Sequence, residues 1–206
     1  MSKKMYVKSK VIFISMVKDF AFASGKIALG IYTFSVFLCI SGVASVLTGF
    51  ARRTYLKGEK AARGDDEKEY QYYLKIALFI LGGSTAATLY MARLFFVPSQ
   101  NHYEMIPAIA IATMAFVELG FAIAGVAKTK DLLASAIKIL NLTTAFSAIV
   151  LTQVAILSFA NENDVSYFNA IGGVIFGGLS IVAAFFMLWK YWRHKIQLTK
   201  DEKPTE

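Results

Sequence analysis

The stretch Met105–Ala127, MIPAIAIATMAFVELGFAIAGVA, decides the fold class. A helix needs about 20 consecutive apolar residues to cross a bilayer, and this stretch supplies them around one charged residue, Glu118. Four further apolar runs of similar length are Ile27–Phe50, Tyr73–Val97, Leu132–Phe159 and Ala170–Trp189. The sequence therefore predicts an all-α, polytopic transmembrane helix bundle that forms one integral membrane domain over residues 1–206.

Composition supports a membrane class. The 206 residues are 56% hydrophobic and only 17% charged, whereas soluble proteins are nearer 25% charged. The net charge of +8 arises mainly from Lys and Arg near the ends of the apolar runs, where the positive-inside rule and anionic headgroups account for them. We therefore expect the lipid bilayer, and no nucleic acid, as a partner. Cys39 is the only cysteine, so no internal disulfide can form.

The N-terminal run Met5–Ser24 is weaker because Lys18 and Asp19 interrupt it. If it crosses, the N-terminal lysines, the connection 51–72 and the C-terminal tail share one basic side, with Lys26 alone outside. We favour this reading: six spans in a cell membrane, with both termini cytoplasmic. The alternatives are five spans preceded by an interfacial amphipathic helix or by a cleaved signal peptide.

Lys10, Lys75 and Lys138 each begin a run that leaves the basic side, which suggests three tandem helical hairpins. The connection 51–72 is predicted to be a charged cytoplasmic piece. Its acidic residues at 65–67 favour a helix that begins near Asp66. The polar tail 196–206 is expected to be disordered and cytoplasmic.

Glu118 is the strongest candidate for a site, because a carboxylate inside a membrane is costly and usually functional. It lies about 3 Å from the centre of its span by helix rise. Asn141, Lys138 and Thr144 lie on the next span, which a short connection makes an antiparallel neighbour. A hydrogen bond from Glu118 to Asn141, with Lys138 nearby, would tie the two helices together; a proton or cation relay is the alternative.

A second polar cluster is predicted toward the outside: Tyr90, Arg93, Glu104 and Gln153. Arg93 can pair with Glu104 across the short loop between their spans, or it can simply anchor its helix at the headgroups.

Small residues spaced for close helix packing form a third group: Gly82, Gly83, Gly120, Gly173 and Gly177. Packing inside the bundle explains them. A homo-oligomer formed through Gly173 and Gly177 is the alternative.

Motifs for chemistry are lacking. The sequence has no phosphate-binding Gly-rich loop, no His-Glu-x-x-His and no Cys-x-x-Cys, so we expect no metal, no cofactor and no enzyme. The favoured function is that of a non-enzymatic membrane protein acting through protein partners or in envelope stress or self-protection. The alternative is a small transporter or channel, or a transporter's membrane subunit, that uses Glu118 as an intramembrane carboxylate.

Three Gly-containing runs begin at Gly42, Glu118 and Gly172 and read GVASVLTGF, ELGFAIAG and GGVIFGGLSIV. They resemble the glycine-containing helices of small bacterial HdeD-type acid-resistance membrane proteins. The resemblance covers residues 27–192 and implies a six-span architecture built from hairpins. It implies no catalytic residues.

Overall fold

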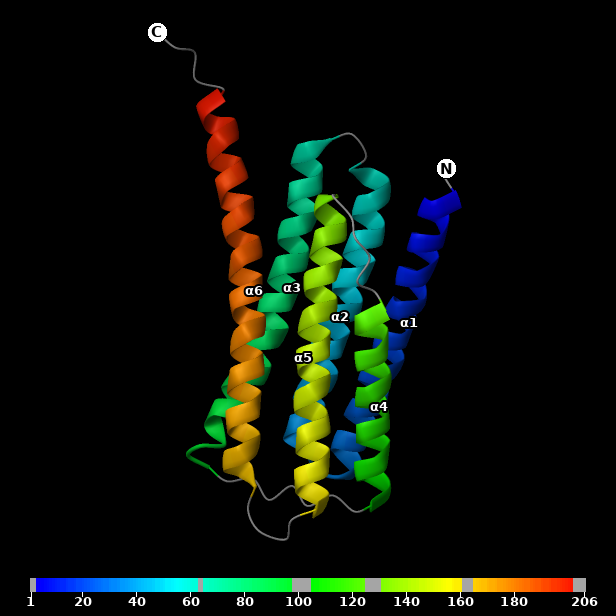
Figure 1. Ribbon diagram of the computed structural model, residues 1–206, viewed down its shortest axis with the longest axis vertical. Helices are drawn as coiled ribbons and strands as arrows, with labels where there is room; N and C mark the ends of the chain where they lie inside the picture. The colour runs from blue at the N-terminus through cyan, green and yellow to red at the C-terminus, as the bar shows by residue number, and fades with distance from the viewer. Residues whose placement is uncertain (1–2, 63–64, 98–104, 125–130, 161–164, 202–206) are drawn as a thin grey trace.

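The computed structural model describes residues 3–62, 65–97, 105–124, 131–160 and 165–201. These residues form six α-helices in one bundle and no strand, as the sequence predicted (Figure 1). The helices are α1 (Lys3–Tyr32), α2 (Val36–Ala61), α3 (Asp66–Arg93), α4 (Met105–Ala124), α5 (Leu132–Ala160) and α6 (Ser166–Asp201).

Five helices, α2 to α6, are long and apolar enough to cross a membrane. Within the most apolar part of each helix, only 28% to 39% of the residues are buried in the protein, so the other residues keep part of their surface exposed. Such a surface suits a hydrocarbon environment. α1 is as long as its neighbours but carries Lys18, Asp19 and Lys26 in its apolar part.

The helices pack in an order that differs from three tandem hairpins. α1 packs along α2, α3 lies against both α2 and α6, and α5 contacts α2, α3, α4 and α6. α4 packs along α5 and meets α1. Within the described residues α3 and α4 do not touch, so the middle hairpin of the predicted repeat is wrong. The order of the helices along the chain does not reveal that, in the described part of the protein, α3 packs against α6 and not against α4.

The start of α1 and the end of α6 lie at the same end of the bundle (Figure 1). The end of α2 and the start of α3 also lie at this end, whereas the turn between α1 and α2 lies at the opposite end. This arrangement brings the basic residues of α2 and α6, including Lys60 and Arg193, to one end of the molecule.

The predicted span Ile27–Phe50 is wrong at its start. Residues 27–32 complete α1, and α2 begins only at Val36. Ser35 caps α2 by accepting a hydrogen bond from the Leu38 amide at 3.4 Å, and Phe34 reverses the chain with a φ of 52°. Hydropathy misses this turn because apolar residues flank it. Lys26 therefore belongs to a helix and not to an outer connection.

The connection 51–72 and the C-terminal tail are more helical than the sequence predicted. α2 runs to Ala61 and α3 starts at Asp66, so most of the connection 51–72 is helix. Asp65 caps α3 by accepting from the Lys68 amide at 3.0 Å, and its hydrogen bonds with Lys68 lower the pKa of its carboxyl. α6 continues to Asp201, so the tail is helical where disorder was predicted from residue 196; residues 202–206 lie outside the described part.

Two apolar clusters form the core. One includes Phe37, Met91, Ile111 and Leu151, and the other includes Tyr73, Ile76, Leu140 and Met187. A layer of polar side chains lies where the two clusters meet, because members of both line the same central cavity. This layer holds the candidate site.

Candidate intramembrane polar site

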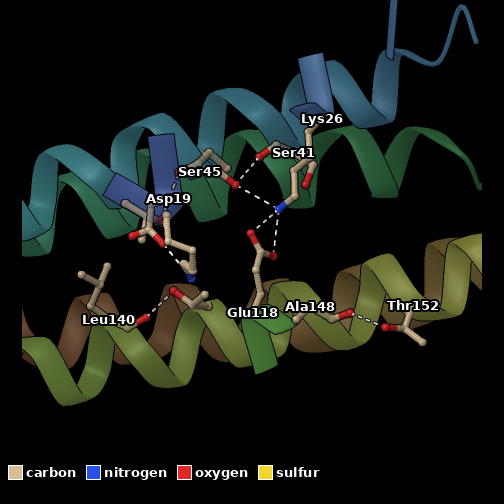
Figure 2. Close-up of polar contacts among 12 residues, drawn as sticks. Asp19, Lys26, Ser41, Ser45, Glu118, Leu140, Ala148 and Thr152 are labelled. Carbon is tan, nitrogen blue, oxygen red and sulfur yellow. Dashed lines mark hydrogen bonds and ion pairs between the residues drawn. The ribbon is translucent and has the colours of Figure 1, made fainter. Parts of the chain in front are cut away.

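Glu118 of α4 is paired with Lys26 of α1. The Lys26 Nζ donates hydrogen bonds to both carboxylate oxygens of Glu118, at 2.7 and 2.8 Å, and to the Ser45 hydroxyl of α2 at 3.0 Å (Figure 2). Lys26 is 2% exposed and Glu118 is 3% exposed. Hydrogen bonds between oppositely charged groups are shorter and stronger than those between neutral groups. The pair joins α1 to α4 across the middle of the bundle.

A second buried ionic group lies farther along the same helix. Arg52 Nε of α2 donates to an oxygen of Asp19 of α1 at 2.6 Å, and both side chains are 3% exposed. Lys18 Nζ lies 2.8 Å from the other Asp19 oxygen, an ion pair without the alignment of a hydrogen bond. Lys18 also lies over the ring of Phe121 on α4, 5.3 Å from its centroid. Asp19 is therefore neutralised on both sides.

The two ionic groups share one register. Asp19 and Lys26 are seven residues apart on α1, and their partners Ser45 and Arg52 are seven apart on α2. Seven residues are two helical turns, so each pair falls on one face with about 10 Å between its members. Because α1 and α2 run in opposite directions, this spacing places both groups along one α1–α2 seam.

A cavity of about 70 Å³ lies beside this seam, and all six helices contribute to its wall. A water molecule needs roughly 10 to 15 Å³ on the same measure, so the cavity has room for several. Three charged residues line it: Asp19, Lys26 and Glu118. Its other polar residues are hydroxyl-bearing: Ser41, Ser45, Thr48, Ser84, Thr143, Thr144, Ser147 and Ser180.

Most of these hydroxyls donate a hydrogen bond to a backbone carbonyl of their own helix. Thr48 donates to the Ala44 carbonyl at 3.1 Å, and Thr144 donates to the Leu140 carbonyl at 2.8 Å. Ser45, Thr143 and Ser180 make equivalent bonds. A hydroxyl has one proton and two lone pairs, so what it still offers is acceptor capacity. The cavity wall is thus rich in oxygen acceptors.

The structure brings some residues of the predicted inner site together and separates others. Glu118 and Thr144 both line the cavity, as a common site requires. The predicted bond from Glu118 to Asn141 is wrong: the carboxylate pairs with Lys26, and the buried Asn141 Oδ1 has no hydrogen-bond partner. Lys138 is half-buried and does not belong to the cavity wall. α4 does pack along α5, but its carboxylate points to α1.

Sequence reasoning missed four residues of this site: Asp19, Lys26, Ser45 and Arg52. From the sequence, Asp19 is treated as an interruption of a weak span and Lys26 as an outer charge. Arg52 is included in the charged connection 51–72, and Ser45 is not singled out. The seven-residue spacing on two adjacent runs was the available signal. Charges that share one helix face are more consistent with an interior contact than with a broken span.

The predicted outer cluster does not assemble as one site in the part of the chain that the structure describes. Tyr90 is buried and its ring stacks on Phe37 with centroids 6.1 Å apart. Gln153 Nε2 donates to the Phe168 carbonyl at 2.8 Å. Arg93 is exposed in the last turn of α3, which fits an anchor at the headgroups. Glu104 lies outside the described residues, so an Arg93–Glu104 pair stays a prediction.

Some of the predicted packing glycines contact a neighbouring helix closely, and others do not. A methyl group on Gly173 or Gly177 of α6 would collide with Met91 or Thr88 of α3, so both allow close approach inside the bundle. That contact places them against α3, and the homo-oligomer alternative stays a prediction. Gly83 makes ordinary contacts with Ala44 and Leu47. The packing role predicted for Gly82 and Gly120 is wrong, since a Cβ added at either position would meet no atom of another described element within 4 Å.

Comparisons with known proteins place the chain in no family. No protein-family model matches it, and a search of curated proteins finds no significant relative. The resemblance to HdeD-type proteins therefore stays a prediction.

Proposed function

We propose that this multi-pass membrane protein is a non-enzymatic transporter or channel that moves a small ion or polar solute through the central cavity. Its intramembrane carboxylate is Glu118, and Lys26 is the group that holds it in place. The observation that carries the proposal is the cavity itself: all six helices contribute to it, and it contains a buried ion pair and many hydroxyls.

A purely structural bundle gains little from such an interior. Removing two charges from water costs several kcal/mol per ion, and apolar side chains of similar volume often stabilise a fold equally well or better. Retention of a charged pair next to a hydratable space is therefore more consistent with a pathway than with a helix clamp. Apolar clusters on both sides of the polar layer suit a site that opens to one side at a time.

The proposal includes a topology. We propose that α1 also crosses, because its length matches the other spans and two of its interrupting charges, Asp19 and Lys26, are buried against α2 and α4. Six crossings place both termini on the cytoplasmic side of a cell membrane, with the basic ends of α2 and α6. The role through protein partners that the sequence favoured has no described contact behind it and stays a prediction.

Flux in proteoliposomes tests the proposal. The purified protein is reconstituted, an ion or pH gradient is imposed, and its decay is followed with an enclosed dye. We expect decay above that of empty vesicles, and loss of the excess in Glu118→Gln. Glu67→Gln makes the same chemical change at an exposed position and is expected to behave as wild type. Flux that is absent in wild type, or unchanged in Glu118→Gln, contradicts the proposal.

A further inference from the structure

We infer that the transported species is a monovalent cation such as Na⁺ or K⁺, and that the Lys26 ammonium occupies its binding position in the present structure. This inference rests on the proposed function, because it assigns a substrate class and an exchange step to the same cavity. It follows from three features: the acceptor-rich wall, the position of Lys26, and the charge balance of the interior.

The wall matches the chemistry of a hard monovalent cation. Such ions are held by oxygen atoms of carboxylates, hydroxyls, carbonyls and water. Four hydroxyls donate their proton to backbone carbonyls and can therefore accept only through their lone pairs: those of Thr48, Thr143, Thr144 and Ser180. Glu118 supplies the negative charge. An anion would need donors, and Lys26 is the only cationic side chain in the wall among the described residues.

Lys26 already makes the contacts that a cation would make. Its Nζ is surrounded by three oxygens, two from Glu118 and one from Ser45, at 2.7 to 3.0 Å. An ammonium group has three donors and no acceptor, so it is a tethered equivalent of a free monovalent cation. A cation that enters the cavity therefore competes with Lys26 for the same oxygens.

The second ionic group cannot take part in this exchange. Asp19 also lines the cavity, but Arg52 holds it at 2.6 Å and Lys18 lies at 2.8 Å. A guanidinium does not lose its proton in proteins, so Asp19 stays paired. A lysine ammonium, in contrast, can be deprotonated when buried. The pair that can open is therefore Lys26–Glu118.

Charge balance sets the stoichiometry. The interior holds three cations, Lys18, Lys26 and Arg52, against two anions, Asp19 and Glu118. The described residues that line the cavity from α3, α5 and α6 are uncharged. Adding a cation without losing one would leave a larger unpaired charge in a low-dielectric interior. Cation entry is balanced when Lys26–NH₃⁺ becomes Lys26–NH₂ and its proton passes to cavity water. The step exchanges one cation for one proton and is electroneutral.

Cation binding to the purified full-length protein in detergent tests the inference separately from transport. Titration with NaCl and KCl, against choline chloride at equal ionic strength, is followed by calorimetry and by a pH indicator in weak buffer. We expect wild type to bind Na⁺ or K⁺ and to release about one proton per ion. Lys26→Met removes the tethered competitor and is expected to raise the apparent affinity about tenfold or more. The proton that the ion releases in this variant then comes from the Glu118 carboxyl.

Lys138→Met is the matched control, because Lys138 is an intramembrane lysine outside the cavity wall and is expected to bind as wild type does. Lys26→Gln repeats the test with a polar side chain if Lys26→Met folds poorly. Lys26→Met combined with Glu118→Gln is expected to bind neither ion.

Binding by Lys26→Met no tighter than by wild type overturns the inference. So does wild-type binding without proton release, or a response that follows the anion when gluconate replaces chloride. In each of these cases Glu118-dependent flux in vesicles can still be present, and the proposed function then stands with another substrate. Cation binding with no flux removes the proposed function and the transport step, and leaves only the cation site in which Lys26 competes.

Discussion

The ion pair Lys26–Glu118 makes a quantitative prediction about stability. Glu118→Leu removes two of the three oxygens that Lys26 Nζ contacts, together with the compensating charge, and leaves Ser45 as its remaining contact. Breaking a buried pair by removing one partner costs about 3 to 5 kcal/mol. Lys26→Met leaves Glu118 without its ammonium partner in the same way and is expected to cost about 3 to 5 kcal/mol as well.

The double variant Lys26→Met/Glu118→Leu leaves no unpaired charge and fills a similar volume. We expect it to lie within about 1 kcal/mol of wild type, so the two positions couple by about 3 kcal/mol or more. The assay is equilibrium unfolding by SDS in mixed micelles, followed by circular dichroism, for all four proteins of the cycle.

A cycle at the exposed pair Asp65–Lys68, with Asp65→Asn and Lys68→Met, is the control and is expected to be additive, because exposed ion pairs are screened by water. If the buried cycle is additive within about 0.5 kcal/mol, the two side chains do not interact. The site would then have to be described without this pair.

Three further predictions follow from other parts of the fold. Asp19→Asn leaves Arg52 and Lys18 without their shared anion and is expected to cost about 3 to 5 kcal/mol in the same SDS assay; stability equal to wild type would contradict the buried placement. Gly173→Ala and Gly177→Ala collide with α3 and should each cost about 1 to 3 kcal/mol, whereas Gly82→Ala, in open space, should be neutral or slightly stabilising; equal effects at all three positions would refute the α3–α6 contact. In a Cys39→Ser background, Phe34→Cys in the exposed α1–α2 turn should react with a membrane-impermeant maleimide from outside whole cells, while Ser2→Cys should react only after lysis; outside labelling of both would exclude α1 as a span.

The sequence predicted the fold class well because membrane spans obey a simple rule of length and apolarity. Each of the five clear runs lies largely within one helix, although Ile27–Phe50 also includes the α1–α2 turn. Asp66 begins α3 where its acidic residues indicated. The pairing of helices could not be obtained in this way, since hydropathy says which segments are apolar and not which faces meet. α3 packs on α6, which lies far along the chain, and α4 packs on α5.

The site was predicted at one residue and missed at its partners. Glu118 stood out because it is an isolated charge in an apolar run. Lys26 did not, because the turn at Phe34 was unseen and the lysine fell at the edge of the next predicted span. Asn141 looked like a partner because α5 is adjacent to α4. The direction of a side chain around its helix, which decided between α1 and α5, depends on packing that sequence proximity does not encode.

The protonation state of Glu118 tests the account most directly. Infrared spectra of wild type and Glu118→Gln in lipid at neutral pH are subtracted, so that the difference contains the bands of the Glu118 carboxyl and, with opposite sign, those of the substituted Gln amide. The ion pair with Lys26 predicts ionised carboxylate bands and no protonated carbonyl band, and Lys26→Met should convert the first into the second. A protonated carboxyl in wild type would contradict the account, because it would mean that Glu118 is a neutral hydrogen-bonding group with no ammonium beside it.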